Sequence, residues 1–292
     1  MPKVQHISSI NGVHLFLKRE DLIHPNISGN KWWKLKYNLE QAKKEGKDTI
    51  LTFGGAYSNH IHATAAAGKE FGMKTIGIIR GEELNADNST LKFAESCGMK
   101  LVFISREQYR QKETEAFLKE IDDRFNHPYI VPEGGSNVLA LKGCMEMMQN
   151  MSENYDFYCC AAGTGATMAG ITAYSGGENI VLGFSSLKDG AFLADNVSSL
   201  LVEGGYNYSN YEIITDYHFG GYGKVTKELV LFINDFKRLY SIQLDPVYTA
   251  KMMFGIMDLI NRGFFPHGSR ILAVHTGGIQ GIDGYREKFK FE

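Results

Sequence analysis

Hydrophobic and polar positions alternate along the chain in a pattern that predicts repeated strand–helix units. Short apolar runs, such as 49–53 and 157–161, are followed by amphipathic stretches, such as 59–71 and 166–174. A compact apolar run is typical of a strand buried on both faces, whereas apolar residues spaced three or four apart are typical of a helix with one buried face. Their regular alternation predicts a mostly parallel sheet flanked by helices, and therefore an α/β fold.

The same pattern gives the order of the elements and a division into two lobes. The predicted strands are 49–53, 75–79, 101–104, 129–131, 157–161, 180–184, 211–215 and 270–275. The predicted helices are 31–46, 59–71, 89–97, a polar helix that includes Leu118 and Ile121, 138–151, 166–174, 192–202, 227–240 and 246–262. We expect residues 34–145 to form a small α/β domain inserted into a large domain made of residues 1–33 and 146–292.

Composition narrows the class of partner. The chain has 292 residues, 43% of them hydrophobic, which is enough for a large core. It carries 31 basic and 33 acidic residues without a long run of one sign, so a small molecule is favoured over nucleic acid or an anionic membrane. The N-terminus lacks the apolar segment of a signal peptide, and no stretch approaches the roughly 18 apolar residues of a membrane span. We therefore expect a cytoplasmic protein.

Cysteine and histidine spacing indicates neither disulfides nor a metal site. Cys159 and Cys160 lie inside an apolar run, where small buried residues of a strand are the simplest interpretation. His60 and His62 are two positions apart, which directs them to different sides of a helix. We expect no structural metal.

A glycine-rich loop is a candidate phosphate site. Residues 163–167 (GTGAT) follow the apolar run that ends at Ala162 and precede a helix rich in small residues. Glycines allow a ligand to approach the backbone, and the free N–H groups of a helix start favour a phosphate. A tight strand-to-helix turn would have the same composition. The loop matches neither the dinucleotide fingerprint nor the Walker sequence, which disfavours a nicotinamide enzyme.

Two further segments could carry chemistry. In 28–34 (SGNKWWK), Lys31 begins a helix beside two tryptophans, and both features favour the neutral amine that condenses with a carbonyl. Most lysines are solvated surface charges, so position alone does not select Lys31. In 54–60 (GGAYSNH), Ser58 and Asn59 are good helix caps. The functional alternative is that Ser58 transfers protons or binds a carboxylate, while Asn59 donates a hydrogen bond to a cofactor oxygen.

In their order, these segments resemble the fold-type II pyridoxal-phosphate enzymes of the tryptophan synthase β-like fold, specifically the family of 1-aminocyclopropane-1-carboxylate deaminase and D-cysteine desulfhydrase. The resemblance covers nearly the whole chain. It rests on the segments 18–21 (KRED), 28–31 (SGNK), 54–55 (GG), 58–59 (SN), 134–137 (GGSN), 163–167 (GTGAT), 221–223 (GYG), 245–249 (DPVYT) and 275–278 (HTGG).

The resemblance implies roles for individual residues. Lys31 would form the Schiff base with pyridoxal 5'-phosphate and then transfer protons. Ser58, Tyr222 and Tyr248 would face the substrate, and Asn59 would bind the cofactor's phenolic oxygen. The phosphate would be held, with help from Lys34, by Gly163, Thr164, Gly165, Ala166 and Thr167. The family also implies a homodimer.

Two threonines favour one substrate over another. In the deaminase pattern a glutamate occupies the position of Thr249 and keeps the pyridine nitrogen protonated, and a leucine occupies that of Thr276. Threonine at both positions is the D-cysteine desulfhydrase pattern, and a hydroxyl makes the ring a weaker electron sink. Elimination from D-cysteine, giving pyruvate, ammonia and sulfide, is therefore the leading hypothesis. Deamination of 1-aminocyclopropane-1-carboxylate to 2-oxobutyrate, dehydration of D-serine and a non-catalytic protein that binds the cofactor or an amino acid remain alternatives.

Overall fold

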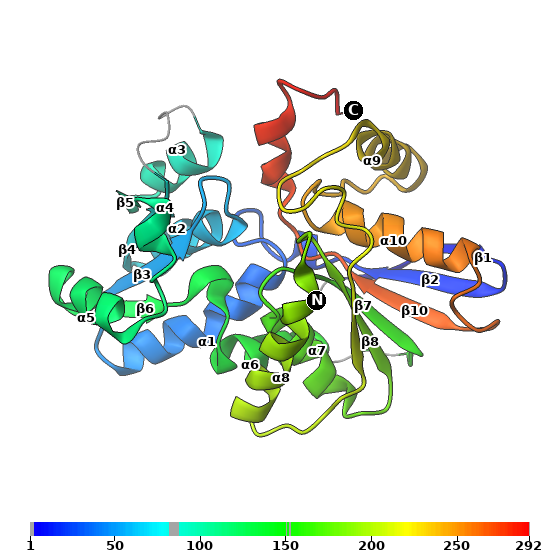
Figure 1. The fold of residues 1–292 in the computed structure, drawn as a ribbon, viewed down its shortest axis with the longest axis horizontal. Coiled ribbons are helices and arrows are strands. Elements are labelled where there is room, and N and C mark those ends of the chain that lie inside the picture. Colours follow the sequence, from blue (N-terminus) through cyan, green and yellow to red (C-terminus); the bar gives the residue numbers. More distant parts are fainter. Residues whose placement is uncertain (1–2, 82–87, 150, 152, 292) are drawn as a thin grey trace.

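The structure, a computed structural model, describes residues 3–81, 88–149, 151 and 153–291 and contains two sheets (Figure 1). The larger sheet has six strands in the order β1-β2-β10-β7-β8-β9. Its strands are parallel except for the β1–β2 pair. Their bounds are β1 Val4–Ile10, β2 Val13–Lys18, β7 Phe157–Ala162, β8 Ile180–Ser185, β9 Tyr211–Ile214 and β10 Arg270–Val274.

The smaller sheet is parallel throughout and has the order β5-β4-β3-β6. Its strands are β3 Thr49–Gly54, β4 Lys74–Arg80, β5 Lys100–Ile104 and β6 Tyr129–Val131. All four lie between the first and second parts of the chain that build the larger sheet. The mixed α/β architecture predicted from hydrophobic patterning is therefore confirmed, while the division at residues 34 and 145 stays a prediction.

Helices cover both faces of each sheet (Figure 1). On the larger sheet, α6, α7 and α8 pack on one face and α9 and α10 on the other. The α-helices are α1 Asn30–Lys44, α2 Asn59–Phe71, α3 Ser89–Ser96, α4 Arg106–Tyr109, α5 Glu115–Arg124, α6 Val138–Met147, α7 Ala166–Ser175, α8 Leu193–Glu203, α9 Lys227–Tyr240 and α10 Thr249–Asn261.

Strand β7 shows why the larger sheet has two cores. Cys159 packs into the core beneath α9 and α10, and its neighbour Cys160 packs into the core beneath α6, α7 and α8. Both thiols are free and buried, and burial raises the pKa of Cys160 to about 12. Their interpretation as small buried residues of a strand is confirmed.

An N-terminal hairpin is present that the hydrophobic pattern does not predict. Strands β1 and β2 pair antiparallel, from Val4 opposite Lys18 to Ile10 opposite Val13. The turn between them contains Asn11 and Gly12, both with positive φ (50° and 75°), and Asn-Gly is the preferred sequence for such a turn. Many polar residues in β1 weaken the apolar signal, so the turn dipeptide was the available sign of a hairpin.

The helix boundaries that differ most from the prediction are those of α6 and α10. Helix α6 ends at Met147 rather than at 151, and residue 150 of the predicted segment lies outside the described residues. Helix α10 begins at Thr249 rather than at Pro246. The carboxylate of Asp245 accepts the backbone N–H groups of Val247, Tyr248 and Thr249, which holds this stretch as a cap before the helix.

The start of α1 is held close to the larger lobe by tight helix packing. A side chain at Gly143 of α6 would collide with the carbonyl oxygen of Trp33, and one at Gly170 of α7 would collide with Cys144 of α6. These contacts stack α1, α6 and α7. No helix in the described part of the chain is long and apolar enough to cross a membrane.

Candidate active site

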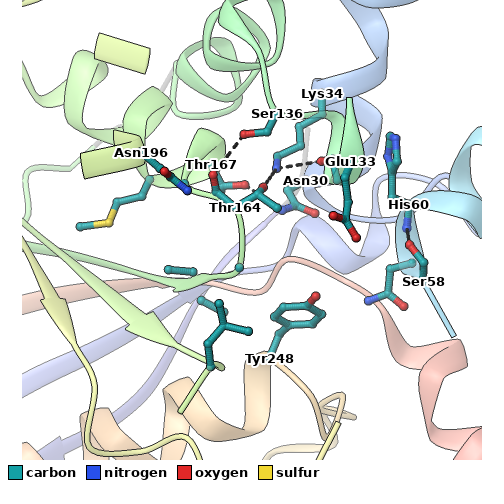
Figure 2. Close-up of a pocket in the computed structure, with 18 of the residues that line it drawn as sticks. Asn30, Lys34, Ser58, His60, Glu133, Ser136, Thr164, Thr167, Asn196 and Tyr248 are labelled. Atoms are coloured by element: carbon teal, nitrogen blue, oxygen red, sulfur yellow. Dashed lines mark hydrogen bonds between the residues drawn. The ribbon is translucent and has the colours of Figure 1, made fainter. Parts of the chain in front are cut away.

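A cavity of about 630 Å³ opens where the carboxyl ends of strands from both sheets meet (Figure 2). Strands β3 and β4 of the smaller sheet and β7 and β10 of the larger sheet lead into it. Ligands bind at this edge of parallel α/β sheets because loops there feed helix N-termini. The predicted site residues that line the cavity are Lys31, Lys34, Ser58, Asn59, Gly163, Thr164, Gly165, Thr167, Tyr222, Tyr248 and Thr276.

Lys31 lies in the first turn of α1 with its amine in the cavity. Its Nζ donates to Oδ1 of Asn30 at 3.1 Å. Burial, and then the neighbouring charge of Lys34, lower the pKa of Lys31 to about 7. A large fraction of this amine is therefore neutral near pH 7, which is the form that attacks a carbonyl.

The two tryptophans beside Lys31 contribute less than the sequence indicated, since neither lines the cavity. The indole of Trp33 donates to Glu20 at 2.7 Å, and Trp32 stacks on His24. The shifted pKa of Lys31 therefore comes from burial in the cavity wall and from Lys34.

Lys34 is buried one turn further along α1 and points to the glycine loop (Figure 2). Its Nζ donates to the carbonyl oxygen of Gly134 at 3.1 Å and to Oγ1 of Thr164 at 3.5 Å. Burial lowers its pKa. Among the described residues, no carboxylate forms an ion pair with this ammonium group, so an anion in the cavity would compensate its charge.

The glycine loop joins β7 to α7 and forms one wall of the cavity. Gly165 has φ +94°, a conformation that glycine adopts without strain, and α7 begins without a side-chain cap. Asn30 donates to Oγ1 of Thr167 at 2.8 Å, and Ser136 donates to the carbonyl oxygen of Thr164 at 3.1 Å. The open N–H groups of an uncapped helix start suit a phosphate.

Ser58 and Asn59 stand at the start of α2. The Ser58 hydroxyl caps the helix by accepting the N–H groups of His60 at 3.2 Å and Ile61 at 3.3 Å. The capping interpretation is thus correct, and the same hydroxyl also borders the cavity. The side chain of Asn59 lines the cavity too, and its Oδ1 accepts a hydrogen bond from Gln280.

His60 has a defined tautomer. The Thr52 hydroxyl donates to the carbonyl oxygen of Val131 at 2.8 Å and lies 2.8 Å from Nε2 of His60. Because that hydroxyl has a single proton, His60 Nε2 must be the donor of the second bond. Nδ1 then carries a lone pair, buried without a hydrogen-bond partner among the described residues. Burial holds the pKa of His60 well below its usual value, so the ring is neutral.

Two tyrosines form the wall opposite Lys34. Tyr248 packs against the glycine loop, where a side chain at Gly163 would come within 3.0 Å of its ring. Tyr222 meets Tyr248 edge to face, with ring centroids 6.1 Å apart. Burial raises the pKa of both phenols, so both are protonated donors at neutral pH.

Lys251 connects Tyr222 to the body of the protein. This lysine of α10 is buried, and its Nζ donates to the carbonyl oxygens of His218 and Gly221, each at 2.8 Å. Burial lowers its pKa to about 8. The two bonds hold the loop that carries Tyr222.

Two predicted cofactor residues do not line the cavity. Ala166 is buried in the first turn of α7, where its side chain joins the core. The hydroxyl of Thr249 donates to Oδ1 of Asp245 at 2.8 Å and accepts the N–H of Asp245 at 2.8 Å. Thr249 is therefore engaged with its own helix cap, and a contact to the cofactor ring stays a prediction.

Charged residues at the cavity mouth had no predicted role. Glu133 accepts from the hydroxyl of Tyr109 at 2.8 Å and pairs with Lys112 at 3.4 Å. Arg80 stands over the ring of Tyr109, 5.6 Å from its centroid. Arg80 is the last residue of strand β4 and Glu133 lies two residues after the end of strand β6, so strand ends were a usable signal for both. Lys112 lies on an irregular connection.

Comparison with known proteins identifies the class. Residues 2–277 match the family model described as "Pyridoxal-phosphate dependent enzyme", and the chain belongs to this family. The fold is that of the fold-type II enzymes in it.

Particular relatives narrow the group. The chain is 32% identical to a putative 1-aminocyclopropane-1-carboxylate deaminase of Pyrococcus furiosus, over 97% of this chain and 90% of that protein. It is 30% identical to a bifunctional D-cysteine desulfhydrase/1-aminocyclopropane-1-carboxylate deaminase of Arabidopsis thaliana, described as mitochondrial. That match covers 93% of this chain and 74% of that protein. A crystal structure of an ACC deaminase homologue superposes with a TM-score of 0.86 at 30% identity and covers 98% of this chain and 92% of that one.

The cavity fits pyridoxal phosphate on its own geometry. The aldehyde of this cofactor requires a neutral amine, which Lys31 provides. Its phosphate requires N–H groups and a positive charge, which the uncapped start of α7 and the buried Lys34 provide side by side. The cofactor assignment from sequence is confirmed by the family.

Proposed function

We propose that this enzyme eliminates hydrogen sulfide from D-cysteine. D-Cysteine and water would give pyruvate, ammonia and hydrogen sulfide, as the C–S bond breaks after the α-proton is removed. Pyridoxal phosphate, when bound, draws electrons from the α-carbon of an attached amino acid, which makes this proton removable. Thiolate is a good leaving group, so a modest electron sink is sufficient.

The proposed roles follow from the positions of the residues. Lys31 attaches the cofactor and, once released, accepts the α-proton at Nζ. Lys34 and the backbone of residues 163–167 hold the phosphate. The hydroxyl oxygen of Ser58 accepts its two hydrogen bonds from the backbone, which leaves the hydroxyl proton available. Ser58 can therefore donate a hydrogen bond to the substrate carboxylate. The protonated phenols of Tyr222 and Tyr248 stand on the substrate side.

The observation that supports the choice of substrate is that no carboxylate among the described residues of the cavity wall is free to pair with a ring nitrogen. Among the described residues that line the cavity, the carboxylates are Glu113 and Glu133, both beside Lys112. The nearby carboxylate of Asp245 is occupied by three backbone N–H groups and the Thr249 hydroxyl. Without a further carboxylate among the described lining residues, the ring nitrogen of a bound cofactor would lack an acidic partner, which favours elimination of a good leaving group over opening of a cyclopropane.

Parallel assays test this proposal. Purified protein with saturating cofactor is incubated with D-cysteine, L-cysteine, D-serine and 1-aminocyclopropane-1-carboxylate, and sulfide, pyruvate and 2-oxobutyrate are measured. The proposal predicts sulfide from D-cysteine at the highest kcat/KM. Production of 2-oxobutyrate alone would establish deamination instead, which the names of several relatives support. Full cofactor occupancy without turnover of any substrate would indicate a non-catalytic binding protein.

We further propose a cytoplasmic homodimer with residues 34–145 as an inserted domain. The strands of the smaller sheet all fall within that range.

On α9, Leu231 and Leu239 are 65% and 67% exposed and share one side of the helix, as an association surface requires. Sedimentation of the wild type and of Leu231→Glu tests the assembly, and a monomeric wild type would rule it out.

A further inference from the structure

The segment that follows the last strand returns to the cavity. Residues Ile279–Tyr285 form a short 3-10 helix, and Nε2 of Gln280 donates to Oδ1 of Asn59 at 2.9 Å. We propose that Gln280 is a positioning residue that orients the amide of Asn59, so that its NH₂ group serves as a donor to the ring oxygen of the cofactor. This rests on the proposed contact between Asn59 and that oxygen.

The chemistry of an amide makes this orientation consequential. One end of the Asn59 side chain accepts hydrogen bonds and the other donates them. Rotation by half a turn exchanges the two ends at little steric cost, so shape alone does not select one. Because Gln280 occupies Oδ1, the NH₂ group of Asn59 remains for another partner. An electron-rich phenolic oxygen needs a donor, and the opposite orientation would present it with a second acceptor.

Close packing fixes the position of the Asn59 amide, while the hydrogen bond from Gln280 selects its orientation. Gly278 has φ +85°, and a side chain there would come within 2.2 Å of Nδ2 of Asn59. The amide of Asn59 thus lies directly on the backbone of the turn that leads to Gln280. A larger residue at position 278 would displace it.

The 3-10 segment is anchored beyond Gln280. The hydroxyl of Tyr285 donates to the carbonyl oxygen of Gly223 at 2.9 Å, and a side chain at Gly284 would meet the ring of Tyr57 at 2.7 Å. Gln280 is therefore presented by a segment attached to two loops of the site, those that carry Tyr222 and Ser58. Its contact with Asn59 is part of a fixed arrangement.

The orientation has a spectroscopic consequence. A donor on the ring oxygen stabilises the form with more negative charge there, and so lowers the pKa of the proton that the attached cofactor shares with the lysine nitrogen. In Gln280→Glu the new carboxylate accepts rather than donates, so the NH₂ of Asn59 turns toward it. The carbonyl of Asn59 would then face the ring oxygen and raise that pKa.

The test is a pH titration of the visible absorption of the holoenzyme, together with the cofactor dissociation constant. Gln280→Glu should raise the midpoint by about one pH unit and weaken cofactor binding by about tenfold, the scale of one inverted hydrogen bond. The leucine in Gln280→Leu neither donates nor accepts a hydrogen bond, so the midpoint and the affinity of this variant should lie between those of Gln280→Glu and the wild type. The wild-type charged groups that act on Lys31, including Lys34 and Asp245, are kept in every variant, and Gln280→Glu alone adds a carboxylate near the site.

Two controls and a fallback variant make the result decisive. Gln149→Glu introduces the same charge at an exposed position after α6 and should change nothing. In an Asn59→Ala background, Gln280→Glu should no longer move the midpoint, because Gln280 acts through Asn59. If Gln280→Glu does not fold, as judged by circular dichroism, Gln280→Leu and its double variant provide the same comparison.

The outcomes are distinguishable. An unchanged midpoint and affinity in Gln280→Glu, or an equal shift in the Asn59→Ala background, would overturn the role of Gln280. A wild-type protein that binds no cofactor would overturn the proposed function as well. Failure to release sulfide from D-cysteine would concern the substrate alone.

Discussion

The two sides of the cavity are built differently. The side assigned to the cofactor phosphate comes from α1 and the β7–α7 loop. Two hydrogen bonds join these elements, one from Lys34 to Thr164 and one from Asn30 to Thr167. The side assigned to the substrate comes from separate loops and the C-terminal segment. Tyr222 on it is 42% exposed as a whole residue, although burial of its phenol raises the pKa of that group. The phosphate side is thus built from buried groups of regular elements, while the substrate side is carried largely by loops.

Replacement of Lys31, which stands between the two sides, should have the largest effect. Lys31→Ala removes the attachment point of the cofactor and the proposed proton acceptor, so sulfide release should fall by at least about 10³-fold. The visible absorption of the bound cofactor should change in parallel. Turnover at a wild-type rate would assign the chemistry to another lysine.

Replacement of Lys34 isolates the phosphate side. Lys34→Met removes a buried charge-assisted hydrogen bond, and the cofactor dissociation constant should rise about 10- to 100-fold. Fluorescence titration of the apoprotein measures it. Lys36→Met is the matched control, because Lys36 on the same helix pairs with Glu146 at 2.7 Å and does not line the cavity. Equal effects of the two variants would contradict the assignment.

The pH dependence of cofactor capture should follow Lys31. Its pKa is lowered to about 7, so the reactive neutral fraction, and with it the capture rate, should rise about tenfold from pH 6 to pH 8. The unfolded chain holds this proton up to about 10.5, so the stability of the apoprotein should increase with pH between these values. Stopped-flow absorbance measures capture. A flat profile would mean that Lys31 titrates elsewhere.

Replacement of Lys251 isolates the substrate side. Lys251→Met leaves the carbonyl oxygens of His218 and Gly221 without their donor and loosens the loop of Tyr222. KM for the substrate should rise several-fold, about the effect of one lost hydrogen bond, while the cofactor dissociation constant stays unchanged. Steady-state kinetics and cofactor titration together check this. Weakened cofactor binding would show that the two sides are not independent.

The same contrast explains what could be predicted from the sequence. The glycine loop and the start of α1 lie at the junctions of regular elements, where apolar periodicity and local composition are informative. The choice of Lys31 and Lys34 among the lysines came from the family resemblance. The Asn59–Gln280 bond joins residues 221 positions apart, and no local pattern encodes it. Helix α10 begins at Thr249, later than the periodicity indicated, and the Thr249 hydroxyl therefore bonds to Asp245 in the cap before the helix. For this reason, its relation to the cofactor ring could not be derived from its position in the sequence alone.

The most direct test of the central claim is the site of cofactor attachment. The holoenzyme is reduced with borohydride, digested and analysed by mass spectrometry. The phosphopyridoxyl group should be found on Lys31 and should be absent from Lys34 and every other lysine. A modified lysine elsewhere, or an unmodified Lys31 in a fully loaded protein, would contradict the account.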